Sequence, residues 1–443
     1  MRGPRSCPDE VRGLAMLIVT IAFVVLMLMG MPVAFAIAIS GALFFLQYPD
    51  LPITIPLQLT VSQTQNFALL AIPLFIMAGN FLNKSGITEQ LLNLASVLTG
   101  RLKGGLAQVS IALAALMGGV SGSAIADAAM QTRMLGGEML KRGMSKGFTA
   151  GVLSFGALLT PIIPPGIGMI IYGTIGQVSI GRLFAAGFVP ALLLWIALAT
   201  TIWWTARRRG YAPERETRPS VGEVVGALHG GIWALLFPMF LLMGLRLGVF
   251  TPSEIGAFAV VYAIVIGALI YRKLGRRSFA EALEGSLSDV GAVMFLIAVS
   301  AIFSYGIVFE QVPLAVSDAI LGLTDDLNVV MILIVLFVLA AGFVIDATVL
   351  IIMLTPIFLP MIRSLGGDPV HFGLVFIIAA TIGNFTPPVG AAMYAVCSIL
   401  RTSIGDYARE SVPLFIAVAL MTLFLIFVPE AILFVPNLIF GRF

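Results

Sequence analysis

The stretch Ser121-Gly122-Ser123-Ala124-Ile125-Ala126-Asp127 places two hydroxyls, a glycine and a carboxylate inside an otherwise apolar segment. A second carboxylate, Asp346, follows another long apolar run in the second half of the chain. An intramembrane carboxylate is costly and usually functional. Irregular backbone at membrane depth is tolerated only where it is buried in protein or lines a cavity. The two polar interruptions therefore predict a transport site.

Two proline-rich breaks accompany these carboxylates. They are Thr160-Pro161-Ile162-Ile163-Pro164-Pro165-Gly166 and Gly383-Asn384-Phe385-Thr386-Pro387-Pro388-Val389-Gly390. Proline removes a backbone donor and breaks the helical hydrogen-bond ladder, which leaves carbonyl oxygens free. The interval from Pro164 to Pro387 is nearly the same as the interval from Asp127 to Asp346. Paired broken helices in two halves of a chain are typical of secondary transporters and mark their binding site.

Composition identifies the class of protein. Of the 443 residues 59% are hydrophobic and 11% are charged, and the mean hydropathy is +1.07. A soluble protein carries roughly 25% charged residues, so we expect an all-α polytopic membrane protein in a lipid bilayer. The net charge of +3 gives no reason to expect a nucleic-acid partner. Cys7, Cys397, His229 and His371 form no metal or redox pattern, and the chain has no GxxxxGK[ST] phosphate loop.

The distribution of basic residues predicts the topology, because Lys and Arg in short loops mark the cytoplasmic side. About ten spans are expected, at 14–30, 32–48, 68–84, 148–177, 186–206, 232–248, 253–271, 289–308, 371–400 and 412–435. Segment 106–132 has basic loops on both sides, and segment 329–362 has basic-poor loops on both sides. We therefore predict two re-entrant hairpins, the first opening inward and the second outward.

These hairpins divide the chain into two inverted repeats. The predicted parts are an N-terminal extension at 1–15, N-terminal scaffold spans at 16–67, a first repeat at 68–206, a linker with middle scaffold spans at 207–288, and a second repeat at 289–437. This count places both termini outside, whereas Arg2, Arg5 and Arg12 favour the inside.

The breaks supply oxygen atoms of the kind that bind hard cations, and half-helix N-termini favour anionic groups. Plainer interpretations remain open: close packing of small residues at 121–123, structural kinks at the prolines, and carboxylates that only cap backbone amides. The candidate binding residues are Ser121, Gly122, Ser123, Asp127, Thr160, Pro164, Pro165, Gly166, Asp346, Thr348, Gly383, Asn384, Thr386, Pro387, Pro388 and Gly390.

Three motifs resemble signatures of the large membrane subunit of tripartite ATP-independent periplasmic (TRAP) transporters: the stretch that begins at Ser121, Pro161-Ile162-Ile163-Pro164-Pro165, and the stretch from Gly383 to Gly390. Thr160 and Gly166 depart from the glycine and serine that commonly bracket the second motif in this family. Supporting matches are Ala71-Ile72-Pro73-Leu74-Phe75, Gly104-Gly105-Leu106-Ala107 and Asp368-Pro369. The resemblance implies a sodium-coupled, elevator-type importer of the ion transporter superfamily, in the inner membrane of a bacterium. It implies two partners, a periplasmic solute-binding protein that captures a small organic acid and a separate small four-span membrane subunit.

For this chain we therefore expect no cofactor apart from Na⁺ as coupling ion, bound at Ser121, Ser123, Gly383, Thr386, Pro387 and Asp346. A stand-alone ion-coupled carrier is the alternative, and an ion channel is a weaker one, because paired hairpins favour alternating access over a pore lined by polar rings. The residues show no nucleophile–base constellation, so we expect no enzyme.

Overall fold

The computed structural model describes residues 9–48, 50–65, 67–387 and 390–441, and every regular element in these ranges is a helix. The N-terminal helices are α1 (Asp9–Leu28), α2 (Val33–Gln47) and α3 (Ile55–Thr64). The first half contains η1 (Phe67–Leu70), α4 (Ala71–Lys84), α5 (Ile87–Thr99), α6 (Leu106–Ser121), α7 (Ala124–Gln131), η2 (Thr132–Gly136), α8 (Gly137–Lys141), α9 (Lys146–Ala157), η3 (Thr160–Ile162), α10 (Ile167–Gly176) and α11 (Ile180–Arg209).

The middle of the chain contains α12 (Val221–Arg246), α13 (Pro252–Val265) and η4 (Ile266–Ile270). The second half contains α14 (Arg276–Phe309), α15 (Val312–Leu321), α16 (Leu327–Gly342), α17 (Ala347–Ser364), α18 (Pro369–Gly383), α19 (Ala391–Leu400), α20 (Ile404–Phe427) and α21 (Pro429–Phe440). The predicted domain boundaries at 206/207 and 288/289 fall inside the continuous helices α11 and α14.

Membrane-spanning length is met by six helices of the described residues, or seven if the pair Lys146–Ile162 and Ile167–Gly176, bent by 43°, is one span. Shorter apolar helices, among them α2, α16 and α18, accompany them. The chain is thus an all-helical polytopic membrane protein, and the count of ten spans stays a prediction. The span expected at 412–435 is present with shifted bounds, as Ile404–Phe427, because the chain breaks at Val428 and Pro429 begins α21.

Both predicted hairpin turns and both predicted helix breaks are present. The α6–α7 pair turns at Gly122, and the α16–α17 pair turns at residues 343–346. The α9–α10 helix breaks at 158–166, and the α18–α19 helix breaks after Gly383. The order hairpin, broken helix and long helix therefore occurs in each half.

The two halves interlock through equivalent contacts. Within each half the first hairpin arm packs on the first part of the broken helix, α6 on α9 and α16 on α18. Between halves the second arm packs on the second part of the other broken helix, α7 on α19 and α17 on α10. The first part of each broken helix also packs on a long helix of the other half, α9 on α20 and α18 on α11. These matching pairs support two structural repeats, and their orientation across a membrane stays a prediction.

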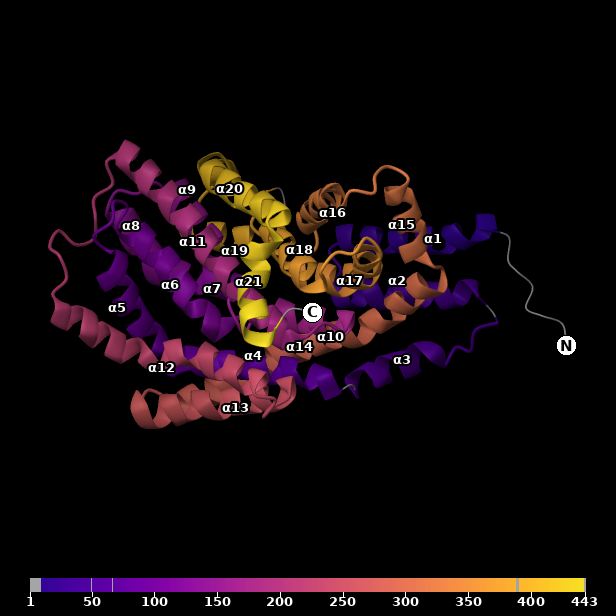
Figure 1. The fold of residues 1–443 in the computed structure, drawn as a ribbon, viewed down its shortest axis with the longest axis horizontal. Helices are drawn as coiled ribbons and strands as arrows, with labels where there is room; N and C mark the ends of the chain where they lie inside the picture. The colour runs from indigo at the N-terminus through magenta and orange to yellow at the C-terminus, as the bar shows by residue number, and fades with distance from the viewer. Residues whose placement is uncertain (1–8, 49, 66, 388–389, 442–443) are drawn as a thin grey trace.

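Most buried apolar side chains form one cluster that runs from Leu69 to Ile432, and a second cluster joins α1, α2 and α14 to Val349 and Met353 of α17. Figure 1 shows α1, α2, α15 and the α16–α17 hairpin toward the right, and α5, α12 and α13 toward the lower left. The breaks that carry the candidate residues belong to the elements that lie between these two ends.

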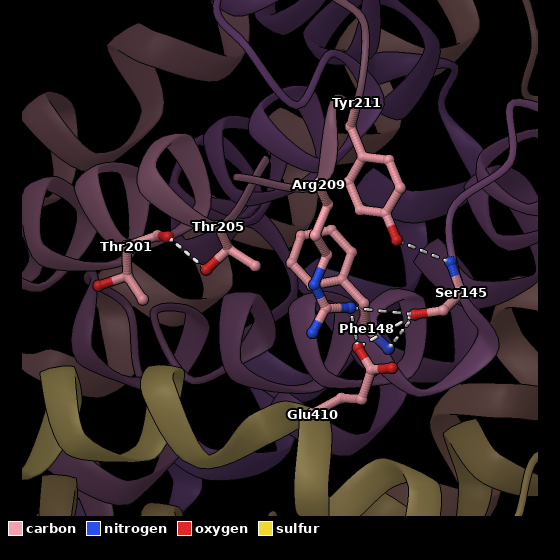
Figure 2. A network of polar contacts seen from close by, with 7 residues as sticks. All are labelled: Ser145, Phe148, Thr201, Thr205, Arg209, Tyr211 and Glu410. Carbon is pink, nitrogen blue, oxygen red and sulfur yellow. Dashed lines mark hydrogen bonds and ion pairs between the residues drawn. The ribbon is translucent and has the colours of Figure 1, made fainter. Parts of the chain in front are cut away.

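A polar network joins the end of α11 to α20 and to the start of α9 (Figure 2). The Arg209 guanidinium pairs with Glu410, and the Ser145 hydroxyl donates to the same carboxylate at 3.0 Å. The Ser145 N–H donates to the Tyr211 phenol oxygen at 3.2 Å. Burial would raise the pKa of Tyr211, but the hydrogen bonds from Ser145 and Arg209 outweigh burial and lower it. The network thus ties α11 and α20 to the N-cap of α9.

Candidate functional site

Asp127 is the centre of the first-half site. Ser123 caps α7, its hydroxyl accepting from the Ala126 N–H, and places Asp127 in the first helical turn. The Asp127 side chain is 1% exposed, and each carboxylate oxygen accepts a hydroxyl hydrogen bond. Ser121 donates to Oδ1 at 2.6 Å and Thr160 donates to Oδ2 at 2.7 Å. Since Ser121 ends α6 and Thr160 lies within the break, one buried carboxylate holds the hairpin to the broken helix.

The hairpin tip is seated on the Pro164–Pro165 segment, whose peptide bond is cis. Gly122 has φ +65°, and a Cβ there would lie 2.8 Å from the Pro165 carbonyl oxygen. One turn earlier, a Cβ on Gly118 would lie 2.6 Å from Ile163. Only glycine permits this conformation and this close approach. The tip packs against a buried segment that consists of Pro164, Pro165 and Gly166.

Asp346 plays the corresponding part in the second half. It caps α17, Oδ1 accepting from the Thr348 N–H at 2.8 Å. Its other oxygen, Oδ2, accepts from the Asn384 amide at 3.1 Å. The backbones meet beside this bond, because a Cβ on Gly383 would lie 2.5 Å from the Gly342 Cα. A hairpin carboxylate therefore bonds the adjoining break in both halves.

The second break folds back on itself after Gly383. The Asn384 carbonyl accepts from the N–H groups of Ala392 and Met393, at 3.1 and 3.3 Å, which anchors the start of α19. Thr386 and Pro387 are half-buried, and the Thr386 hydroxyl donates to the Ile382 carbonyl at 2.8 Å. Gly390 closes the loop with its Cβ position 2.5 Å from the Asn384 carbonyl oxygen. The predicted site residue Pro388 lies outside the described residues.

Asp127 and Asp346 do not occupy equivalent positions in the two halves, although the sequence pairs them. Counted back from the matching prolines Pro164 and Pro387, the position equivalent to Asp346 is Ser123. Both residues cap the second arm of their hairpin. Asp127 lies one turn further into α7, which accounts for the slightly shorter interval between the two carboxylates than between the two prolines. The two halves therefore have the same order of hairpin cap and break. They differ in the position of the carboxylate, which is the cap residue in the second half and lies one turn after the cap in the first.

Two contributors were missing from the predicted set of site residues. Gly342, at the edge of the predicted turn, makes the close contact with Gly383, and its signal was a glycine just ahead of the carboxylate. Tyr407 donates to the Phe385 carbonyl within the second break at 2.7 Å. No local pattern around Tyr407 indicated this contact, because it depends on how α20 packs.

The donor set suits a hard monovalent cation. Hydroxyl and carboxylate oxygens lie at the first break, and a hydroxyl, a carboxylate and the Asn384 amide lie at the second. Backbone carbonyls of unwound helices are the usual sodium ligands of transporters with broken helices. Within the described ranges, no group of three or more His, Cys, Asp and Glu side chains would hold a metal ion. Hydroxyl, carboxylate and amide oxygens are donors that hard cations prefer.

Paired hairpins with carboxylates bonded to broken helices define the class, a multi-pass membrane transporter built from two repeats. Residues 20–431 match the family described as "Tripartite ATP-independent periplasmic transporter, DctM component". The chain belongs to this family of TRAP transporter large permease subunits, and it is a transport protein, not an enzyme.

Relatives in this family cover nearly the whole chain. The 2,3-diketo-L-gulonate TRAP transporter large permease protein YiaN of Escherichia coli is 32% identical over 91% of this chain and 95% of its own. The sialic acid TRAP transporter large permease protein SiaM of Vibrio cholerae is 32% identical over 94% and 97%. The isethionate TRAP transporter permease protein DctMQ of Oleidesulfovibrio alaskensis is 31% identical over 93% of this chain and 65% of its own.

A solved structure shares the fold at low identity. It is described as "Structure and Function of Neisseria gonorrhoeae MtrF Illuminates a Class of Antimetabolite Efflux Pumps", with a TM-score of 0.53 and 16% identity over 85% of this chain and 84% of that one. This likeness concerns the fold alone.

Proposed function

We propose that this chain is the large permease subunit of a sodium-coupled importer of small organic acids, dependent on a binding protein and placed in the inner membrane of a bacterium. The observation that carries the proposal is the repeated arrangement of hairpin and break. Asp127 bonds Thr160 in one half, and Asp346 bonds Asn384 in the other. Two oxygen-rich sites, one per half, suit two cations that flank a substrate.

The first cation is assigned to the tip of α6–α7, with the hydroxyls of Ser121 and Ser123 and the backbone of Gly122. The second is assigned to Gly383, Thr386 and Pro387 together with Asp346. The half-exposure of Thr386, Pro387 and Asp346 supports this assignment, because a ligand must be able to reach them. The buried Asp127 then has a supporting role, since both of its oxygens are already bonded to hydroxyls.

An anionic substrate is supported by the helix starts and by the relatives. The half-helices α10 and α19 begin directly after the two breaks, so the positive ends of their dipoles lie at the breaks. The relatives are named for 2,3-diketo-L-gulonate, sialic acid and isethionate. These compounds share an acidic group, and we assign a small organic acid to this chain as well.

The partners follow from the family. We assign a separate small four-span membrane subunit and a periplasmic solute-binding protein, in keeping with a relative named DctMQ of which this chain covers 65%. Transport then proceeds by alternating access of an elevator type. The interlocked halves, α7 on α19 and α17 on α10, support movement of the two breaks as one body.

The test is uptake by the permease, reconstituted with its small subunit in vesicles. Labelled organic acids are screened with and without the loaded binding protein, under an inward sodium or potassium gradient. We expect uptake only with sodium and the binding protein together. Equal uptake of free substrate without the binding protein would establish the stand-alone carrier instead, and sodium-independent uptake would remove the coupling assignment.

A further inference from the structure

The peptide that follows Asn384 is anchored through the ring and the carbonyl of Phe385. The Phe385 ring is fully buried and packs against Phe155 of α9, with ring centroids 6.3 Å apart. The Phe385 carbonyl accepts the Tyr407 hydroxyl hydrogen bond at 2.7 Å. The ring and the carbonyl of Phe385 are therefore both fixed by contacts, while the next two residues, Thr386 and Pro387, are half-buried.

Close packing of α9 and α20 brings Tyr407 to this carbonyl. A Cβ on Gly147 would lie 2.6 Å from the Asp406 carbonyl oxygen, and a Cβ on Gly151 would lie 2.5 Å from the Ser411 hydroxyl. Two glycines one helical turn apart let membrane helices approach closely. Tyr407 lies between these two contacts on α20 and is fully buried.

The same helix also leads to the first break. Phe155 lies near the end of α9, shortly before Thr160, which donates to Asp127. Phe155 packs against Phe415 of α20 as well, with centroids 6.5 Å apart. Phe155, at the end of α9, therefore connects the two breaks. It packs against Phe385 of the second break, and α9 leads into the first break.

We propose that Tyr407 is a positioning residue for the second cation site: its hydrogen bond fixes the Phe385 peptide and so sets where Thr386 and Pro387 present their oxygens. Tyr407 itself touches no ligand. The inference rests on the proposed sodium coupling. Without the hydroxyl, the Phe385 carbonyl is left buried and unpaired, and the peptide is free to turn. The site then has to be ordered by the cation itself, which weakens cation binding.

The test compares Tyr407→Phe with Tyr262→Phe in the reconstituted complex. Tyr262 is the matched control, because its hydroxyl also donates to a backbone carbonyl, that of Trp233 at 2.6 Å. Tyr262 lies in α13, which packs on α4 and α12. For Tyr407→Phe we expect the half-saturating sodium concentration for uptake to rise about three- to tenfold, in line with the loss of one buried hydrogen bond. Uptake per folded complex at saturating sodium stays near wild type, and Tyr262→Phe leaves the half-saturating concentration unchanged.

A second readout measures binding without transport. The melting temperature of the purified complex is followed as sodium is added, and the midpoint of the stabilisation shifts in Tyr407→Phe by the same factor. Should Tyr407→Phe fail to fold, Phe155→Leu loosens the other anchor of the same peptide and is expected to move the sodium midpoint in the same direction. An unchanged sodium midpoint in a folded variant overturns the positioning role. If neither the uptake nor the melting temperature of the wild-type protein depends on sodium, the proposed function itself is overturned.

Discussion

Asp346 uses its two carboxylate oxygens for different purposes. One oxygen caps α17 through the Thr348 N–H, and the other accepts from Asn384 across the site. Asparagine caps a helix about as well as aspartate does. For Asp346→Asn we therefore expect nearly normal amounts of folded complex, while uptake per folded complex falls at least about tenfold because the negative charge assigned to the second cation site is removed. The measurement is sodium-driven uptake normalised to folded protein.

Asp368 offers a control of the same chemistry. It caps α18, accepting from the N–H groups of Val370 and His371 at 2.7 and 3.1 Å, and it bonds to no described residue of either break. Asp368→Asn is expected to change stability as little as Asp346→Asn does and to leave uptake at the wild-type level. Wild-type uptake in Asp346→Asn, or equal losses in both variants, would show that the Asp346 charge is structural only.

At the scale of the element, the tip of the α6–α7 hairpin depends on a residue without a side chain. Gly122→Ala places a Cβ at φ +65° and 2.8 Å from the Pro165 carbonyl oxygen. We expect a loss of about 1–3 kcal/mol of stability from backbone strain and displacement of the proline segment. The readouts are the melting temperature of the purified complex and its yield by size exclusion.

Gly137 provides the comparison for this hairpin. It is exposed, has helical φ −62°, and a Cβ there meets nothing within 4 Å. Gly137→Ala should be neutral or slightly stabilising, because alanine is the better helix former by about 1 kcal/mol. If the Gly122→Ala protein has the same melting temperature as the wild type, the tip does not pack on Pro165 as described.

Much of the architecture was predictable from the chain, for a physical reason. Hydrocarbon forces polar groups and broken backbone into protected places, so Asp127, Asp346 and the two proline motifs stood out in an apolar sequence. Both hairpin turns and both breaks were located on this basis. The partners of these groups were not predictable. The bond from Tyr407 to Phe385 and the contact of Gly342 with Gly383 arise from helix packing over distances that no local pattern records.

At the scale of the whole molecule, the inverted arrangement makes a prediction about sidedness. If both hairpins are re-entrant, the two flanks of each hairpin emerge on one side of the membrane. Single cysteines at Lys103 and Gly137 report on the first hairpin, and cysteines at Asp325 and Ser364 report on the second. All four positions are exposed in the structure. They avoid Gly143 and Gly366, whose positive φ would strain a cysteine.

We expect a membrane-impermeant thiol reagent, applied to intact cells with the outer membrane permeabilised, to label Asp325→Cys and Ser364→Cys. Lys103→Cys and Gly137→Cys should react only after the inner membrane is opened, because the surrounding loops are basic and basic loops stay in the cytoplasm. The native Cys7 and Cys397 are replaced by serine beforehand. Opposite labelling within either pair would make that hairpin a true crossing. The two halves would then have the same orientation, and two sites related by inversion could not alternate between the faces of the membrane.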